Sequence, residues 1–483
     1  KIDCEYVVLA TGMWSRQIGE KINVSIPLYP NEHFYVITEP MKDLPKNLPV
    51  LRDYNNCLYL KEDAGKMLVG IFEPNAKPAF KNTGVVPDDF SFGELPDDFD
   101  HFEPYLQKSF HRLPMLENAG IRKFFSGPES FTPDTQYLLG ETPEIKKLFT
   151  CCGFNSIGIA SSGGAGRVTA EWMINGHINE DLFSLDIKRF QKFHSSKKFI
   201  MERVTETLGD LYGMHWPFKQ HKTSRNQIIL PYQEELKKLG ACFGTSGGFE
   251  RPMWYALKSE KAEYNYSFGY QNWYPSAEFE TKNTRENVGL FELSPFSKFD
   301  LEGKNVHEEL QKICTANIKD VEGRATYTQM LNEDGGIETD VTVTCLEKNQ
   351  YRVIGPAATR EHDKFHIKKH ISEEVNFKDV TEDLTCLGLY GPNSRKLLSN
   401  ISNDDFTNEG IKFSHGKFVT IDGVKVWAQR LSYVGEIGFE LYTNIDESKK
   451  LFLAIIKEGK NHGLSLCGAH AMDIMRMESG FLH

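Results

Sequence analysis

The chain has 483 residues, of which 40% are hydrophobic and 25% are charged, and its formal net charge is −11. This length and composition are typical of a globular protein with about three domains. The acidic balance argues against nucleic acid as a partner, and the sequence has no apolar run of about 18 residues that would span a membrane. The nine cysteines are scattered except for Cys151 and Cys152, which indicates a reducing compartment.

The first part of the chain mixes strand and helix patterns. Residues 6–12 are a continuous apolar run, which predicts a parallel strand buried on both faces. Residues 33–38 alternate and predict a strand with His33 on one face and Phe34 on the other. Two further strands joined by a turn are predicted within residues 59–69. A helical stripe then follows, formed by Phe99, Phe102, Leu106, Phe110 and Leu113 and ended by Pro114.

The most distinctive stretch lies between residues 148 and 176. Residues 148–154 are predicted to form a buried strand, and residues 168–174 a helix. Between them we expect a turn of small residues that includes Gly158, Gly163, Gly164 and Gly166. Glycines at such a point let a ligand approach the backbone and the positive end of the helix. Because only half of the GxGxxG pattern is present, a tight crossover whose glycines serve packing alone is an equal alternative.

The sequence predicts an α/β fold for the N-terminal part of the chain and an α+β fold for the C-terminal part. We expect an α/β domain over residues 1–180, a connecting subdomain without an obvious site over 181–235, and a largely antiparallel α+β domain over 236–483. The sequence begins inside a strand without methionine and stops directly after a helical segment. We therefore expect a fragment that lacks both ends of its parent protein.

Three groups of residues in the later part of the chain could take part in binding or catalysis, and each also has a purely structural interpretation. Asp340 shares a strand face with Glu338 and can stabilise positive charge on an amine, or else belongs to a solvated polar face. Glu436 lies in a glycine turn open to a flat ligand, or else is a surface acid in a hairpin. Three histidines on a predicted helix have the spacing of metal ligands: His362, His366 and His370. Lysines surround them and no carboxylate or cysteine partner is evident, so we interpret this segment as an ordinary surface helix.

Several motifs together resemble one family over nearly the whole chain. They include VVLATGMWS (7–15), HFYVIT (33–38), GPESFTPD (127–134), GFNSIGIASSGGAG (153–166), GFERPMWY (248–255), YTQMLNEDGGIETDVTV (327–343) and LSYVGEIGFELY (431–442). The sequence resembles the flavin-dependent sarcosine and dimethylglycine dehydrogenases, and more specifically the sarcosine side. In these enzymes a D-amino-acid-oxidase-like flavin domain is fused to a folate-binding domain similar to the glycine-cleavage aminomethyltransferase.

The resemblance implies FAD and tetrahydrofolate as cofactors and assigns residues to them. His33 and Tyr59 match positions near the substrate amine, and Asp340 matches the aspartate that assists folate attack. The residues implied to line the flavin are Gly12, Trp14, Gly153, Gly158, Ser162, Gly163 and Gly164. Pterin-side or structural positions are matched by Tyr327, Glu436, Arg476 and Glu478. The N-terminal GxGxxG motif, the histidine that carries the flavin covalently and the C-terminal part of the folate domain are absent from this sequence.

The implied activity is oxidation of an N-methylglycine. A hydride passes from the N-methyl group to the flavin, and tetrahydrofolate captures the resulting iminium carbon; without folate, water releases formaldehyde. The sequence does not distinguish sarcosine from dimethylglycine as the substrate. It also does not distinguish an electron-transfer flavoprotein from oxygen as the electron acceptor. The compartment would be the cytoplasm in a bacterium or the mitochondrial matrix in a eukaryote. Two alternatives are a regulatory relative resembling the regulatory subunit of pyruvate dehydrogenase phosphatase, and a folate-dependent methyltransferase that uses the flavin half as a scaffold.

Overall fold

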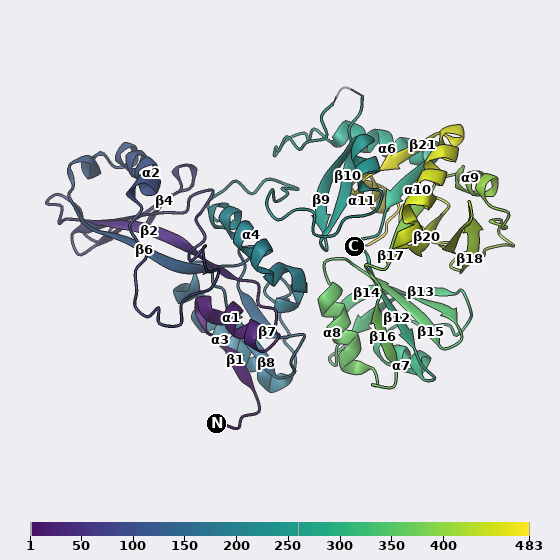
Figure 1. Ribbon diagram of the computed structural model, residues 1–483, viewed down its shortest axis with the longest axis horizontal. Helices are drawn as coiled ribbons and strands as arrows, with labels where there is room; N and C mark the ends of the chain where they lie inside the picture. Colours follow the sequence, from purple (N-terminus) through teal and green to yellow (C-terminus); the bar gives the residue numbers. More distant parts are fainter. Residues whose placement is uncertain (1, 259, 483) are drawn as a thin grey trace. The chain divides into compact units, whose positions relative to one another are not determined.

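The computed structural model describes residues 2–258 and 260–482 (Figure 1). The chain forms two compact units, here called the N-terminal unit (residues 1–215 and 221–224) and the C-terminal unit (residues 216–220 and 225–483). Within the described ranges, no helix has both the length and the apolar character that crossing a membrane requires.

A five-stranded antiparallel sheet is the main framework of the N-terminal unit, with strand order β3-β4-β5-β2-β6. The alternation predicted for residues 33–38 is confirmed, since Phe34 and Val36 are buried in one core cluster with Phe102 and Leu106 of α2. Helix α2 ends just before Pro114, as predicted. The elements are β2 (Tyr29–Thr38), β3 (Leu51–Asp53), β4 (Leu58–Asp63), β5 (Lys66–Ile71), β6 (Ile121–Phe131) and α2 (Phe99–Arg112).

A smaller sheet of the same unit has the order β1-β8-β7, with β1 parallel to β8. It comprises β1 (Val7–Leu9), β7 (Leu138–Glu141) and β8 (Leu148–Cys152). The parallel strand predicted at residues 6–12 is therefore present but short, and its predicted burial on both faces is wrong. Val7 is 46% and Val8 38% exposed, because β1 stands at the edge of this sheet.

Helices complete the N-terminal unit. Helix α4 (Lys197–Asp210) packs along β2 through Ile200, Val204 and Leu208, while α1 (Ser15–Lys21) and α3 (Gly158–Asn175) lie by the smaller sheet in Figure 1. Short 3-10 helices occur in both units: η1 (Gly12–Trp14), η2 (Tyr54–Asn56), η3 (Pro114–Asn118), η4 (Ile187–Arg189), η5 (Lys192–Ser195) and η6 (Lys460–His462).

The C-terminal unit contains a six-stranded sheet with order β18-β19-β20-β17-β11-β21 and a two-stranded hairpin, β9–β10. Its strands are β9 (Ala241–Ser246), β10 (Phe249–Tyr255), β11 (Val288–Glu292), β17 (Leu384–Tyr390), β18 (Gly416–Ile421), β19 (Val424–Gln429), β20 (Gly438–Asn444) and β21 (Leu464–Cys467). Around them lie α5 (Gln233–Lys238), α6 (Tyr274–Glu286), α9 (Ser394–Ile401), α10 (Ile445–Gly459) and α11 (Ala469–Glu478).

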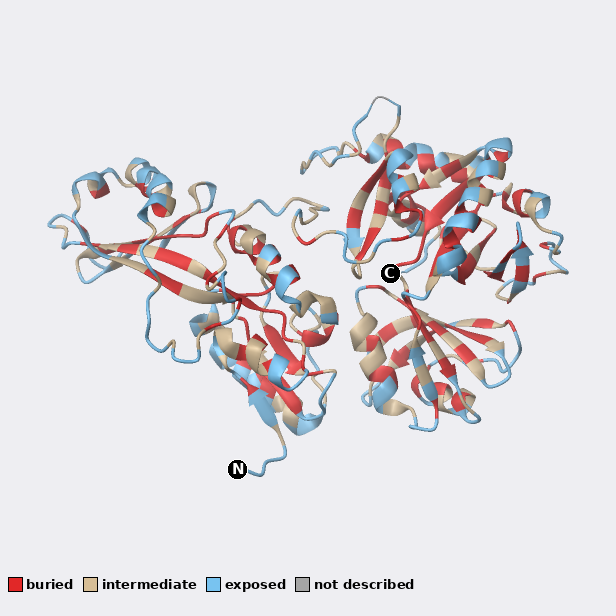
Figure 2. Ribbon diagram, in the orientation of Figure 1, coloured by how far each residue is buried: buried red, intermediate tan, exposed pale blue. Residues whose placement is uncertain are grey.

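A second, five-stranded antiparallel sheet of this unit has the order β13-β14-β15-β12-β16. Its elements are β12 (Ser297–Glu302), β13 (Ala325–Leu331), β14 (Ile337–Glu347), β15 (Gln350–Gly355), β16 (Asn376–Asp379), α7 (Val306–Ile313) and α8 (Arg360–His370). Buried residues alternate with less buried ones along β14 (Figure 2). The largely antiparallel character predicted beyond residue 236 is confirmed, although residues 425–442 form two strands separated by a loop.

Candidate functional site

Two glycine-containing segments that could contact a cofactor follow strands β1 and β8 of the smaller sheet in the N-terminal unit, at the carboxyl ends of these strands. The two strands are parallel, β1 leading into Gly12 and β8 into Gly153. Both glycines have positive φ, +55° and +69° respectively. At Gly153 a Cβ would lie 2.8 Å from the methyl carbon of Thr132, so a side chain is excluded there. Carboxyl ends of parallel strands are where α/β sheets bind ligands.

The glycine-rich segment after β8 is helical, which corrects the predicted turn. Helix α3 begins at Gly158 and includes Gly163, Gly164 and Gly166. Isolated glycines each cost a helix about 1 kcal/mol relative to alanine, but tertiary packing overrides this propensity. Here the opposite side of the helix is buried through Ala165 and its neighbours Val168 and Thr169.

The exposed side of α3 fits a polar cofactor such as FAD. A Cβ built on any of Gly163, Gly164 or Gly166 would meet no atom within 4 Å, so the backbone is open along this side, and Ser162 is exposed on it. The N-cap residue of α3 makes no side-chain cap hydrogen bond, and its first turn has no acidic residue. An uncapped helix N-terminus favours anionic or polar ligands.

His33 and Tyr59 meet on one face of the five-stranded sheet. Nε2 of His33 lies 3.1 Å from the hydroxyl oxygen of Tyr59, and the two rings are parallel within 2°. The ring of Tyr59 lies across Gly70 of β5, where a Cβ would come within 2.0 Å of it. Glycine at this position is therefore what allows a β4 side chain to reach a β2 side chain.

Aromatic rings enclose this pair. Phe72 lies 4.8 Å from the His33 ring and 4.7 Å from Tyr212, whose ring is in turn 4.8 Å from Tyr54. His33 is only 8% exposed. Its Nδ1 atom is buried and, within the described part of the chain, has no hydrogen-bond partner. A buried, unsatisfied nitrogen is costly unless a ligand or water completes it, so this atom is a ready contact for one.

Burial controls the protonation of the pair. It lowers the pKa of His33 from 6.5 to about 4, and it raises the pKa of Tyr59 well above its usual value of 10, with a further contribution from the charge of Glu129. The imidazole is therefore neutral and the phenol protonated at neutral pH. Such a pair offers hydrogen-bonding groups without any fixed charge.

Asp340 lies on β14 of the C-terminal unit and is paired with a tyrosine. The Tyr327 hydroxyl donates a hydrogen bond of 2.8 Å to Oδ2 of Asp340. Tyr327 is 57% exposed, so this carboxylate is held at an accessible edge. The predicted faces of β14 are confirmed, since Val341 and Val343 are buried.

The polar face of β14 is only partly the solvated surface that the purely structural interpretation expected. Thr342 and Thr344 turn towards β19 and β20 across a small cavity that Glu440 also lines. Glu440 accepts a hydrogen bond of 2.6 Å from Tyr442, and burial raises its pKa. Sequence reasoning missed Glu440 because it singled out Glu436 in the neighbouring turn; the alternation along β20 is the signal that separates the two.

The remaining predicted pterin-side residues occupy two ion-pair groups. Arg285 donates hydrogen bonds to Glu436 (2.9 Å) and to Glu478 (2.8 Å), so these two acids share one cation. Arg476 instead contacts Asp473 at 2.8 Å.

The charges of both Asp340 and Arg476 act on Tyr433. Burial raises its pKa, the charge of Arg476 opposes this rise, and the charge of Asp340 adds to it. Its hydroxyl donates to the carbonyl of Leu482 at 2.7 Å. Sequence reasoning did not select Tyr433, although it stands in the same LSYVGEIGFELY motif.

The histidine row on α8 has carboxylate partners that the sequence did not reveal. Nε2 of His362 lies 3.0 Å from Glu338, and Nε2 of His370 lies 3.2 Å from Glu333. The hydrogen bond from His362 holds the pKa of Glu338 well below its usual range. The expectation that no carboxylate stands near was wrong, because β14 and the turn before it supply the acids. These contacts tie α8 to β14 and the turn before it.

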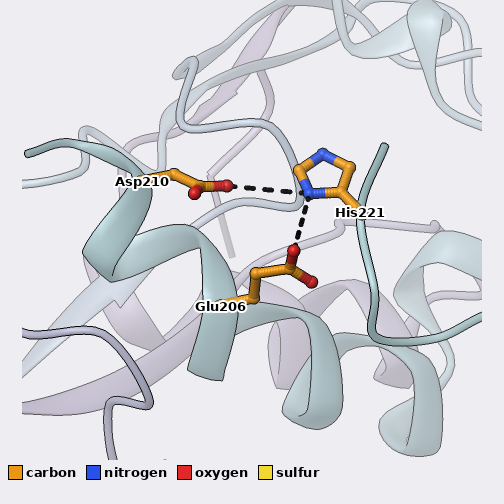
Figure 3. Close-up of side chains that lie close together, drawn as sticks. All are labelled: Glu206, Asp210 and His221. Carbon is orange, nitrogen blue, oxygen red and sulfur yellow. Dashed lines mark ion pairs between the residues drawn. The ribbon is translucent and has the colours of Figure 1, made fainter. Parts of the chain in front are cut away.

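A second polar cluster, Glu206, Asp210 and His221, lies in the predicted connecting subdomain (Figure 3). Nδ1 of His221 is 3.7 Å from each carboxylate. Burial alone would raise the pKa of Glu206, but hydrogen bonds from His221, Thr223 and Lys222 outweigh it and the pKa lies far below its usual range. The cluster therefore anchors residues 221–223 on α4, and we assign no metal to it.

Comparison with known proteins places these features in a family context. The family model described as GCVT N-terminal domain matches residues 232–483, which is more than half of the chain. The model described as FAD dependent oxidoreductase matches residues 1–172, and that described as FAD dependent oxidoreductase central domain matches residues 175–228.

Curated relatives match along the whole chain. The 4-methylaminobutanoate oxidase (formaldehyde-forming) of Paenarthrobacter nicotinovorans is 38% identical over 100% of this chain and 58% of its own length. The mitochondrial pyruvate dehydrogenase phosphatase regulatory subunit of Mus musculus is 31% identical over 100% of this chain and 56% of its own. Mitochondrial sarcosine dehydrogenase of Mus musculus is 32% identical over 99% of this chain and 56% of its own length. The chain thus spans just over half the length of these relatives. It belongs to the GCVT N-terminal domain family, and this domain follows an FAD-dependent oxidoreductase domain.

Proposed function

We propose that this protein oxidises a small N-methylated amino acid with FAD and passes the methyl carbon to tetrahydrofolate. The observation that carries the proposal is the buried, uncharged His33–Tyr59 pair with its unsatisfied Nδ1 atom. The names of two relatives, a sarcosine dehydrogenase and a 4-methylaminobutanoate oxidase, support the same substrate class. Sarcosine and dimethylglycine are the substrates that we propose first.

The amine site would act by positioning and by excluding water. A neutral His33 does not repel a cationic amine, and its Nδ1 atom can hydrogen bond to the substrate. The rings of Phe72 and Tyr212 supply apolar, π-rich walls that suit a methylated ammonium group. The ammonium nitrogen must first give up its N–H proton, which Nδ1 of the neutral His33 can accept. FAD, held along Gly12, Gly153 and the open side of α3, would then supply the acceptor for the hydride that leaves the N-methyl carbon.

The second half of the reaction would take place at Asp340. Its carboxylate, oriented by the Tyr327 hydroxyl, can stabilise the positive charge of the iminium while a nitrogen of tetrahydrofolate forms the new bond to carbon. The products are 5,10-methylene-tetrahydrofolate and the demethylated amine, whereas water in place of folate gives formaldehyde. An electron-transfer flavoprotein or oxygen would then reoxidise the enzyme.

Anaerobic flavin reduction tests the proposal. The flavin-loaded protein is mixed with sarcosine, dimethylglycine or 4-methylaminobutanoate, and its absorbance is followed by stopped flow. We expect reduction by at least one of the three, and a rate lower by about 10²-fold or more in His33→Ala with the flavin still bound. A regulatory relative without amine chemistry would show no reduction by any of them, and this outcome would refute the proposal.

A further inference from the structure

Glu129 stands on the same face of the sheet as His33. Strand β6 lies beside β2 (Figure 1) and pairs with it antiparallel. In this register Gly127 is opposite His33 and Glu129 is opposite Asn31. Cross-strand partners point to the same face, and residues two apart on a strand also share a face. The Glu129 side chain therefore projects on the same face as His33, from β6, whereas Tyr59 reaches His33 on that face from β4 on the other side of β2.

Electrostatic coupling supports this closeness. After burial itself, the charge of Glu129 is the largest influence on the pKa of Tyr59. The groups gathered around His33 are thus an uncharged imidazole, a protonated phenol and one carboxyl group. Among these three, only Glu129 can carry a charge at neutral pH.

No cation of the described residues balances the charge of Glu129. Burial raises its pKa to about 7, and the one opposing contribution is a hydrogen bond from Ser156. No ion pair to Glu129 occurs within residues 2–258 and 260–482. A half-buried carboxylate without an ion-pair partner is costly, and a cationic ligand would offset that cost.

The carboxyl group is also held in place from the cofactor side. Ser156 lies in the short segment between β8 and α3, and that segment is fixed by the hydrogen bond of 2.9 Å that the Thr132 amide donates to Asn155. Glu129 is thereby connected to the loop that precedes the open glycines of α3. It thus interacts both with Tyr59 of the amine pair and with the segment that precedes α3.

We propose that Glu129 determines the specificity of the amine site: its carboxylate pairs with the positively charged nitrogen of the N-methylated amino acid. This inference rests on the proposed function and adds the group that distinguishes an amine from an uncharged ligand of the same shape. His33 and Tyr59 would orient the nitrogen, and Glu129 would select for its charge.

Pairs of ligands that differ by one charge test this role. Dimethylglycine and 3-methylbutanoate have the same shape, but a carbon replaces the ammonium nitrogen in the second; sarcosine and butanoate, or 4-methylaminobutanoate and hexanoate, form equivalent pairs. Isothermal titration calorimetry of the protein with its flavin reduced beforehand, under anaerobic conditions near pH 8, gives the dissociation constant of each without turnover. In Glu129→Gln we expect the preference for the amine over its carbon analogue to fall about ten- to hundredfold, while binding of the analogue stays within about twofold.

Two further variants make the result specific. Glu32 is adjacent to His33 on β2, opposite Pro128, and points to the other face of the sheet, so Glu32→Gln should leave the preference unchanged. Glu129→Asp keeps the charge and should retain most of the preference, which a purely structural role of Glu129 would not produce.

The outcomes separate this inference from the proposed function. If the wild-type protein is reduced by an N-methylated amino acid but Glu129→Gln keeps the full preference, Glu129 has no such role. An equal loss in Glu129→Asp and Glu129→Gln also overturns it, since the charge would then be irrelevant. Failure of all three amines to reduce the wild-type flavin refutes the proposed function instead.

Discussion

Acid should destabilise the N-terminal unit in part through His33. Burial holds the pKa of this imidazole at about 4, against 6.5 for an ordinary histidine, so the unfolded chain takes up a proton before the folded one does. Stability is therefore fully present above about pH 6.5 and is lost as the pH falls towards 4. The linkage relation gives a loss of about 2.5 kcal/mol from this one group between about pH 8 and pH 4.5.

Urea unfolding of the wild type and of His33→Gln at these two pH values measures the effect. Glutamine does not titrate, so the variant should lose about 2.5 kcal/mol less free energy of unfolding on acidification than the wild type does. Other histidines whose pKa is lowered are present in both proteins and cancel in the comparison: His194, His366 and His470.

His111→Gln is the matched control, because His111 is an exposed histidine on α2 of the same unit. It should follow the wild type at both pH values. If His33→Gln and the wild type lose the same free energy on acidification, His33 is accessible to protons in the folded protein, and the assignment of a neutral, water-excluded amine site is refuted.

Three more substitutions test the two sites. Tyr59→Phe removes the 3.1 Å hydrogen bond to His33 and should slow flavin reduction by about tenfold at unchanged flavin content, whereas an unchanged stopped-flow rate would exclude Tyr59 from the site. Asp340→Asn keeps an acceptor for Tyr327 but loses the charge, so amine oxidation should persist while the product shifts from methylene-tetrahydrofolate to formaldehyde; an unchanged ratio with folate still bound would contradict the role. Gly70→Ala places a methyl group about 2 Å from the Tyr59 ring and should cost about 1–3 kcal/mol in thermal unfolding, and no loss would show that the ring does not need this glycine.

Local patterns in the sequence were sufficient to predict those helices and strands whose buried side chains recur with the period of a helix or a strand. The alternation at His33 and Phe34, the two faces of β14 and the stripe of α2 all follow from side chains that repeat with the geometry of one strand or helix. The motifs likewise identified the two-domain family, because they are contiguous stretches of chain.

Contacts between distant segments could not be obtained this way. The pairing of His33 with Tyr59 depends on β5 lying between their strands with Gly70 at the crossing point, and the acids beside His362 and His370 come from another element altogether. The helical state of the glycines in α3 was likewise decided by packing of its buried side against the sheet, which outweighs their low intrinsic propensity. Propensity and period act within a few residues, whereas a buried site is assembled from whichever segments the tertiary packing brings together. This is why the raised pKa of Glu129 and its place on the face of His33 arise only in the folded chain.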